Sequence, residues 1–257
     1  MSPTQRDTVP DGALDRAAAI LGAFDAAHRE LTLAALVARC GLPRSTTHRT
    51  ASALIRLGWL EKPGDRYRIG NRLFEIASLA PIRLELREAV LPFLQDLHQA
   101  TKITVQLGVL DGNQILVVEK ITGHRPMPML SQTGGMIPAH CSALGRAILA
   151  YSAPEVIDAA LAGPLAARTP RTLTSPVAIM RELTAVPERG WAYDREEGNI
   201  DVSCVAAPIF GPLGDVAAAV SVTGPSQLVR ADRMGPAVRM AAAAASRAYT
   251  TRPRPYR

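Results

Sequence analysis

Residues 43 to 50 concentrate side chains that can form hydrogen bonds. The segment reads Pro-Arg-Ser-Thr-Thr-His-Arg-Thr, and every member except the proline carries such a side chain. A helix that packs on a core does not normally hold so many polar residues in its first two turns. In the major groove of DNA, hydroxyls bind phosphates or bases, and arginine binds guanine through two hydrogen bonds. The segment therefore predicts the start of a DNA recognition helix.

The candidate DNA contacts differ in their expected roles. Arg44 and Arg49 are expected to contact bases or phosphates, and the neighbouring hydroxyls to position the helix. His48 is equally well interpreted as a phosphate contact or as a spectator. Basic residues of a predicted hairpin would contact the adjacent DNA backbone. The predicted set is Pro43, Arg44, Ser45, Thr46, Thr47, His48, Arg49, Lys62, Arg66 and Arg68. The alternative is a three-helix domain that contacts proteins.

The positive charge of the chain is concentrated around this segment. The whole chain has a net charge of +6, and residues 39–72 alone hold eight basic and two acidic side chains. A basic cluster of this kind indicates an acidic partner, most often nucleic acid. A solvated basic face is the alternative interpretation.

A second group of residues predicts a site for a small anion. Residues 134–138 form a flexible loop ahead of a predicted helix. Backbone amides at the start of that helix, around Ser142, Ala143 and Leu144, favour a carboxylate. Apolar side chains available for one wall are Met127, Met129 and Leu130.

Four further residues could supply polar groups to such a site. Ser221 and Thr223 alternate along a predicted strand and so face the same side. Asp194 is predicted in a loop and Cys204 at the start of a strand. Each also has a purely structural interpretation, such as a turn cap, a small core residue or a partner of the backbone. Because like charges repel, Asp194 suits a ligand hydroxyl or a backbone amide better than a carboxylate. We therefore expect a small organic acid, hydroxylated or aromatic.

A catalytic interpretation is weaker. His140 and Cys141, with Cys204 and Asp194, are the residue types of a thiol hydrolase. However, adjacent residues seldom point at each other, and the chain lacks GxSxG, HExxH, Walker and dinucleotide-binding motifs. No catalytic residue, cofactor or metal site is predicted.

Composition predicts a globular protein of the cytoplasm. The 257 residues are 47% hydrophobic and 20% charged, which is enough to bury a core. Three widely spaced cysteines without a CxxC motif fit a reducing compartment. Residues 1–12 lack the apolar segment of a secretory signal, and no apolar stretch is long enough to span a membrane.

The residue pattern predicts two domains and an α+β fold. Residues 13–70 are expected to form a winged helix-turn-helix domain after a flexible tail, 1–12. A linker helix, 71–86, would lead to an effector-binding domain, 87–250, and a basic tail, 251–257. The expected helices are 13–28, 33–40, 43–57, 141–151, 154–161, 176–189 and 232–249; the expected strands are 59–62, 66–69, 103–110, 115–119, 203–210 and 216–223. The predicted core of the first domain is Leu21, Phe24, Leu36, Val37, Leu54, Leu57 and Leu60.

Three segments resemble the IclR family of transcriptional regulators. They are LTLAALVARCGLPRSTTHRTASALIRLGWLEKPGDRYRIGNRLFEIASLA, GGMIPAHCSALGRAILA and ERGWAYDREEGNIDVSCVAAPIFGPLGDVAAAVSVTGP, and the similarity spans roughly residues 12 to 249. The resemblance implies a GAF-like C-terminal domain that binds a small effector. It also implies that Asp194, Cys204, Ser221 and Thr223 occupy the positions of the pocket aspartate, cysteine and two hydroxyls. Members of the family form dimers, often paired into tetramers, on operator DNA.

These observations predict a dimeric transcription factor. Its two recognition helices would read half-sites of a palindromic operator. The effector would shift the geometry of the helix at 70–80 by binding one arrangement more tightly than the other. The alternatives are a cysteine-dependent hydrolase and a ligand-binding module without DNA contact.

Overall fold

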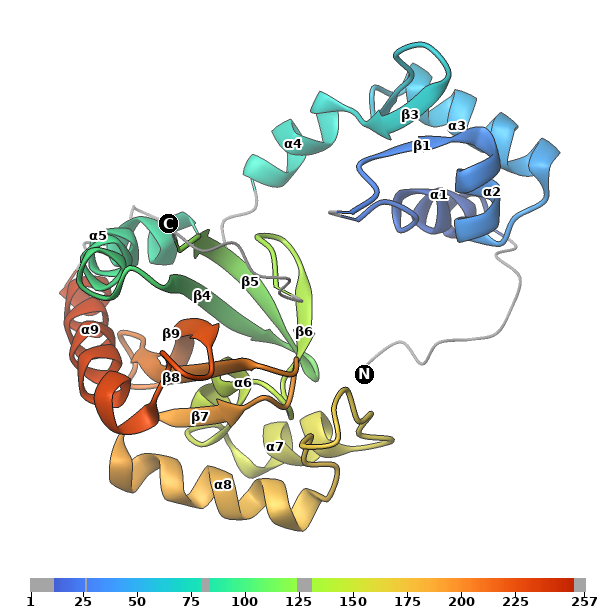
Figure 1. The fold of residues 1–257 in the computed structure, drawn as a ribbon. Helices are drawn as coiled ribbons and strands as arrows, with labels where there is room; N and C mark the ends of the chain where they lie inside the picture. Colours follow the sequence, from blue (N-terminus) through green and yellow to red (C-terminus); the bar gives the residue numbers. More distant parts are fainter. Residues whose placement is uncertain (1–11, 26, 80–83, 124–130, 252–257) are drawn as a thin grey trace. The chain divides into compact units, whose positions relative to one another are not determined.

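The computed structural model describes residues 12–25, 27–79, 84–123 and 131–251. The chain folds as two compact units, residues 1–81 and 82–257, each with its own core (Figure 1). Met127, Met129, Leu130 and most of both predicted tails lie outside the described residues.

The first unit is a helix-turn-helix with a small antiparallel sheet. Its elements are α1 (Ala13–Leu21), β1 (Glu30–Thr32), α2 (Leu33–Cys40), α3 (Arg44–Arg56), β2 (Leu60–Glu61), β3 (Arg66–Ile69) and α4 (Asn71–Ser78). The sheet order is β1-β3-β2. The predicted start of α2 is confirmed, because the Thr32 hydroxyl accepts a hydrogen bond from the Ala35 amide at 3.3 Å. After α2, Gly41 has a φ of 69°, a left-handed conformation that ends the helix.

Two expectations for this unit were wrong. The first helix ends at Leu21 rather than near His28, because the Asp25 carboxylate accepts hydrogen bonds from the Ala27 and His28 amides and closes a turn. Leu57 is not in the core: it follows the last turn of α3, and 58% of it is exposed. The core is built from Ile20, Ala23, Leu31, Leu36, Leu42, Ala51, Leu54, Leu60 and Tyr67.

The second unit is a six-stranded antiparallel sheet with helices on both faces. The strand order is β6-β5-β4-β9-β8-β7. The strands are β4 (Thr104–Asp111), β5 (Gln114–Ile121), β6 (Met136–Pro138), β7 (Ala192–Arg195), β8 (Val202–Phe210) and β9 (Val216–Pro225). Helices α5 (Leu84–Thr101) and α9 (Ala231–Thr251) cover one face, and α6 (Ala143–Leu149), α7 (Pro154–Leu161) and α8 (Pro176–Arg189) cover the other (Figure 1).

Side-chain alternation divides the central strands between these two faces. Val105 and Leu107 of β4 pack in the same cluster as α5 and α9. Gln106 points the other way, and the register places it opposite Ser221 of β9. The α6 side of an otherwise apolar sheet therefore holds buried polar residues. Their presence there marks the face on which a ligand can be recognised.

Sequence patterns missed the two edge strands of this sheet. β6 and β7 contain only three and four residues, too few to show a periodic pattern. Asp194, expected in a loop, lies in β7 and pairs with Cys204 of β8. The register thus places two of the predicted site residues side by side.

Gly145 allows α6 to lie directly against the preceding segment. A Cβ atom at this position would lie 2.1 Å from the carbonyl oxygen of Ala139. Gly145→Ala should therefore force the backbone apart and lower the free energy of unfolding by about 3 kcal/mol or more. Urea denaturation will measure the change. Ala159→Gly, on the exposed side of α7, should cost only about 1 kcal/mol, and an equally small effect at Gly145 would contradict the close packing.

Candidate functional site

The N-terminal half of α3 presents an exposed polar surface. Arg44, Ser45, His48 and Arg49 are exposed, and Thr46 is partly exposed. These residues belong to the helix that follows the left-handed turn at Gly41, and their side chains reach the surface of the unit. The arrangement leaves two guanidinium groups, an imidazole and a hydroxyl available to a partner.

Thr47 is a correction to the predicted DNA contacts. It is fully buried, and its hydroxyl lies 3.3 Å from the carbonyl oxygen of Leu42 and 3.1 Å from that of Pro43. Thr47 therefore fixes the turn between α2 and α3 instead of contacting DNA. Its spacing could have revealed this, because Thr47, Ala51 and Leu54 follow the helical interval of three and four residues and all are buried.

The hairpin β2–β3 carries the basic residues predicted for a wing. Lys62, Arg66 and Arg68 are all exposed. Arg68 forms a two-point ion pair with Glu61 across the hairpin, at 2.7 and 2.9 Å, and Arg68 lowers the pKa of Glu61. Lys62 lies 5.2 Å from the centre of the Tyr67 ring. Much of the charge of Arg68 is thus neutralised within the hairpin, and Arg66 and Lys62 are the better candidates for contact with an anion.

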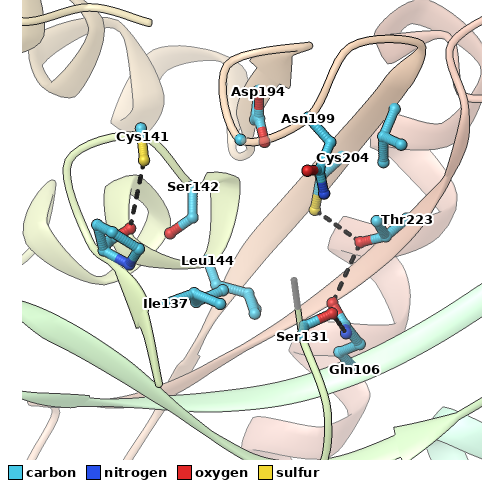
Figure 2. Close-up of a pocket in the computed structure, with 13 residues that line it drawn as sticks. Gln106, Ser131, Ile137, Cys141, Ser142, Leu144, Asp194, Asn199, Cys204 and Thr223 are labelled. Atoms are coloured by element: carbon cyan, nitrogen blue, oxygen red, sulfur yellow. Dashed lines mark hydrogen bonds between the residues drawn. The ribbon is translucent and has the colours of Figure 1, made fainter. Parts of the chain in front are cut away.

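The second unit contains a cavity between α6 and the sheet. Its empty space, including the opening, is about 490 Å³. Segments far apart in sequence converge on it (Figure 2). The lining residues are Gln106, Ser131, Ile137, Pro138, Cys141, Ser142, Leu144, Asp194, Gly198, Asn199, Val202, Cys204 and Thr223.

Five of the predicted effector residues line this cavity, and two do not. Ser142, Leu144, Asp194, Cys204 and Thr223 lie in its wall. Ala143 is fully buried among the core residues beneath α6. Ser221 is fully buried between Gln106 of β4 and Ala206 of β8, and its hydroxyl has no hydrogen-bond partner among the described residues. Because neither is among the lining residues, their contacts with an effector stay predictions, and Met129 lies outside the described residues.

The cavity also contains polar residues that sequence reasoning missed. Gln106, Ser131 and Asn199 all line it. The sequence could have identified Gln106 as a candidate site residue, because it is the one polar side chain in the apolar run Val105–Leu110. Nothing local marked Ser131 or Asn199, which reach the cavity only through the fold.

Burial sets the protonation of the acidic groups in the wall. Burial raises the pKa of Asp194 to about 7, although its carboxylate accepts a hydrogen bond from the Glu197 amide at 2.8 Å. Burial likewise raises the pKa of Cys141 to about 11 and that of Cys204 to about 12. Both thiols are therefore protonated at neutral pH, and Asp194 exchanges its proton near that pH.

The start of α6 uses part of its own hydrogen-bonding capacity. The Ser142 hydroxyl accepts from the Gly145 amide at 3.1 Å, and the Ser142 carbonyl accepts from the Arg146 amide at 3.1 Å. α6 has only seven residues, so its dipole is short. An anion gains less at this helix start than the sequence predicted.

A buried ion pair ties the two sides of the cavity together. The Arg146 guanidinium on α6 forms two hydrogen bonds with the Glu197 carboxylate, which follows β7. Arg146 also donates to the carbonyl oxygens of His140 and Tyr193, and Glu197 accepts from the Leu173 amide. Because these additional hydrogen bonds complete the polar contacts of both side chains, the ion pair fixes the turn that carries Gly198 and Asn199.

The geometry offers no support for a thiol nucleophile. The Nε2 atom of His140 lies 3.2 Å from the carbonyl oxygen of Ala166, and Cys141 Sγ points to the carbonyl oxygen of Pro138 at 4.0 Å. A thiol kept protonated by burial is a poor nucleophile. Within the described ranges, no group of three or more histidine, cysteine or acidic side chains could hold a metal ion, and no helix is long and apolar enough to cross a membrane.

Asp194→Asn should flatten the pH dependence of stability. The folded protein holds a proton on Asp194 up to about pH 7, whereas the unfolded chain loses it near pH 4. Stability of the wild type should therefore fall as pH rises from 4 to 7, an effect that the amide cannot show. The melting temperature of the variant, relative to wild type, should rise across this window in thermal-shift measurements between pH 4 and 8. The exposed Asp158→Asn is the control, and parallel profiles for the wild type and Asp194→Asn would contradict the assignment.

The sequence matches known families along almost all of its length. Residues 13–64 match the IclR helix-turn-helix domain, and residues 80–248 match the family described as bacterial transcriptional regulator IclR C-terminal. The regulator XynR of Escherichia coli is 31% identical over 213 residues, which cover 82% of this chain and 84% of XynR. The transcriptional repressor IclR of Escherichia coli is 31% identical over 209 residues, which cover 79% and 76%.

Solved structures agree with these matches. An IclR homologue from Microbacterium hydrocarbonoxydans, complexed with 4-hydroxybenzoate, superposes with a TM-score of 0.84 at 29% identity and covers 94% of this chain and 100% of its own. The IclR protein of Thermotoga maritima superposes with a TM-score of 0.73 at 26% identity, with coverage of 93% and 97%.

Proposed function

This chain belongs to the IclR family of bacterial transcriptional regulators, and on that basis we propose that it reads operator DNA with the exposed face of α3 and responds to a small organic acid in the α6 cavity. Members of this family are DNA-binding regulators with an effector-binding C-terminal domain, and they are not enzymes. The observation that carries the effector proposal is the cavity itself, in which Asp194, Cys204 and Thr223 are buried together.

The DNA surface combines the start of α3 with the wing. Arg44 and Arg49 are exposed guanidinium groups on one helix, and Ser45 and His48 lie beside them. Major-groove recognition uses this chemistry at a helix N-terminus. Lys62 and Arg66 on the exposed hairpin would contact phosphates beside the groove. Arg68, paired with Glu61, contributes less.

Arg49→Ala and Thr47→Val should distinguish a residue that contacts DNA from a residue that supports the turn before the recognition helix. Arg49→Ala should weaken operator binding by about 10-fold or more, because a base or phosphate contact is lost in each subunit. Thr47→Val should instead lower stability by about 1–2 kcal/mol and leave operator affinity nearly unchanged, because the lost hydrogen bonds lie inside the turn. Gel-shift titrations with DNA flanking the gene, at several salt concentrations, and urea denaturation measure the two effects.

The matched control is Arg181→Ala on α8, which removes the same charge from an exposed site in the other unit. Its salt dependence of DNA binding should equal that of the wild type, whereas Arg49→Ala should show a smaller slope. If Arg49→Ala bound the operator as tightly as Arg181→Ala, the proposed recognition surface would be wrong.

The effector proposal rests on the chemistry of the cavity wall. Ile137, Leu144 and Val202 supply apolar surface, and polar side chains lie at its edges. Such a wall suits a compact apolar body that carries a few polar groups. The similar Microbacterium hydrocarbonoxydans protein was crystallised with 4-hydroxybenzoate, a hydroxylated aromatic acid. A hydroxylated or aromatic acid is therefore the class we propose here.

The regulatory step is an exchange between two arrangements of a dimer. Two copies would place two α3 helices on a palindromic operator, and pairs of dimers would form tetramers. An effector changes operator affinity only if it binds one arrangement more tightly than the other. We propose that the linking segment that contains α4 transmits this preference.

Cys204→Ser should alter the effector response and keep DNA binding. The Cys204 thiol lies 3.0 Å from the Thr223 hydroxyl inside the cavity wall, and the shorter serine side chain would break this contact. We expect a change of about 3-fold to 10-fold in the affinity for 4-hydroxybenzoate or a related acid, equivalent to about 1 kcal/mol. Calorimetry on the full chain and operator titrations with and without the acid check this.

The control is Cys40→Ser in the other unit, which should leave acid affinity unchanged. If no acid of a panel of hydroxylated and aromatic acids bound the wild type or altered its operator affinity, the effector proposal would fail. The assignment of the DNA-binding surface would be unaffected by that result.

A further inference from the structure

Gln106 connects the cavity to a chain of buried hydrogen bonds. Only 2% of Gln106 is exposed. Its Oε1 atom accepts from the Thr223 hydroxyl at 3.3 Å, and its Nε2 atom donates to the Ser131 hydroxyl. Thr223 in turn lies 3.0 Å from Cys204 Sγ. Figure 2 shows these residues grouped along one side of the cavity.

This chain has a direction that determines which protons face the ligand. The Thr223 hydroxyl has one proton, which lies within reach of Gln106 Oε1 and of Cys204 Sγ. With its amide oxygen on Thr223, Gln106 directs its amide nitrogen to Ser131. Among the residues that the structure describes, the second N–H of Gln106 and the O–H of Ser131 have no acceptor. Within the described parts of the chain, two donors are therefore left at this end of the cavity.

A lysine lies directly beside these donors. Lys120 of β5 is the cross-strand partner of Gln106 and is half-buried. Its Nζ atom donates to the carbonyl oxygen of Ser131 at 2.6 Å. An ammonium group has three protons, and this bond uses one of them. Positive charge and spare donors therefore meet around Ser131.

The other end of the cavity has the reverse character. Asp194 and Asn199 lie there, beyond Cys204 and Thr223 as seen from Gln106 and Ser131 (Figure 2). The Asp194 carboxyl accepts from the Glu197 amide, interacts with the Gly198 backbone amide as well, and lies in the cavity wall. Above about pH 7, where Asp194 is ionised, a ligand carboxylate beside it would meet repulsion, whereas a ligand hydroxyl would find an acceptor.

We propose that Gln106 and Ser131 form the carboxylate-binding end of the cavity, with the charge of Lys120 acting from behind Ser131, and that Asp194 receives the hydroxyl of the ligand. The inference rests on the proposed effector function and deepens it. It requires an effector that carries an acceptor and a donor at opposite ends. It also places the carboxylate away from the start of α6, where the sequence alone predicted it.

The test compares 4-hydroxybenzoate with its neutral analogue 4-hydroxybenzamide. Gln106→Glu keeps the side-chain size but replaces the donors with a negative charge. The variant should lose about 10-fold or more in affinity for the acid and less than about 3-fold for the amide. Lys120→Met should show the same selectivity with a smaller loss. Calorimetry on the full chain, with operator binding as a check on folding, gives the affinities of the wild type and both variants for the two ligands.

The matched control is Gln114→Glu, the same substitution at an exposed position of β5. It should leave both affinities unchanged. Asp194→Asn at pH 8.5 tests the opposite orientation, because removal of a charge beside the carboxylate would raise the affinity for the acid about 10-fold or more. Under the proposed orientation this variant binds the acid no more tightly than the wild type does.

The possible results distinguish failure of this inference from failure of the proposed effector function. Equal losses of acid and amide in both Gln106→Glu and Lys120→Met, unchanged acid binding in both, or tighter acid binding in Asp194→Asn would overturn the inference and leave the proposed function intact. If the wild type bound neither 4-hydroxybenzoate nor any other acid of the panel, the effector proposal would fail, and this inference with it. A Gln106→Glu protein that does not fold leaves Lys120→Met and Asp194→Asn to decide.

Discussion

The buried ion pair between Arg146 and Glu197 joins the two sides of the α6 cavity. Both side chains are almost fully buried, a state that is costly unless every donor and acceptor is used. Here backbone groups at residues 140, 173 and 193 complete the hydrogen bonding. The pair therefore joins α6 to the turn after β7, and the space between these elements becomes a cavity. Burial is the main cause of the raised pKa of Asp194; the Glu197 charge raises this pKa further, and the Arg146 charge lowers it.

The sheet beneath the cavity also buries polar groups, but these groups are neutral. Its α5–α9 side is wholly apolar in the centre, and its α6 side buries Gln106, Thr223 and Cys204. These three residues bond to one another, so little of the cost of burying polar groups remains. Ser221 is the exception, because its hydroxyl lacks a partner within the described parts of the chain.

In the DNA-binding unit, too, some polar side chains stabilise the fold and others are left exposed for a partner. Thr47 is buried and secures the turn between α2 and α3, while Arg44 and Arg49 on the same helix stay exposed. Support within the protein thus leaves the charged side chains available for a partner. Each unit has its own core, so DNA and effector can each be recognised by a preformed local structure. Coupling between them must then come from a preference of the effector for one arrangement of the units.

The sequence alone determined the elements whose signals are local. Helices α2, α7 and α8 begin and end where their caps, prolines and glycines predict. The basic segment around α3 and the pairing of Asp194 with Cys204 and Thr223 in one site also followed from residue types and the family resemblance. The tertiary structure decided the rest. The edge strands β6 and β7, the burial of Thr47 and the meeting of Gln106, Ser131 and Asn199 depend on contacts between distant segments. Periodicity reports only which face of its own element a residue occupies, whereas a cavity exists only where several elements leave space between them.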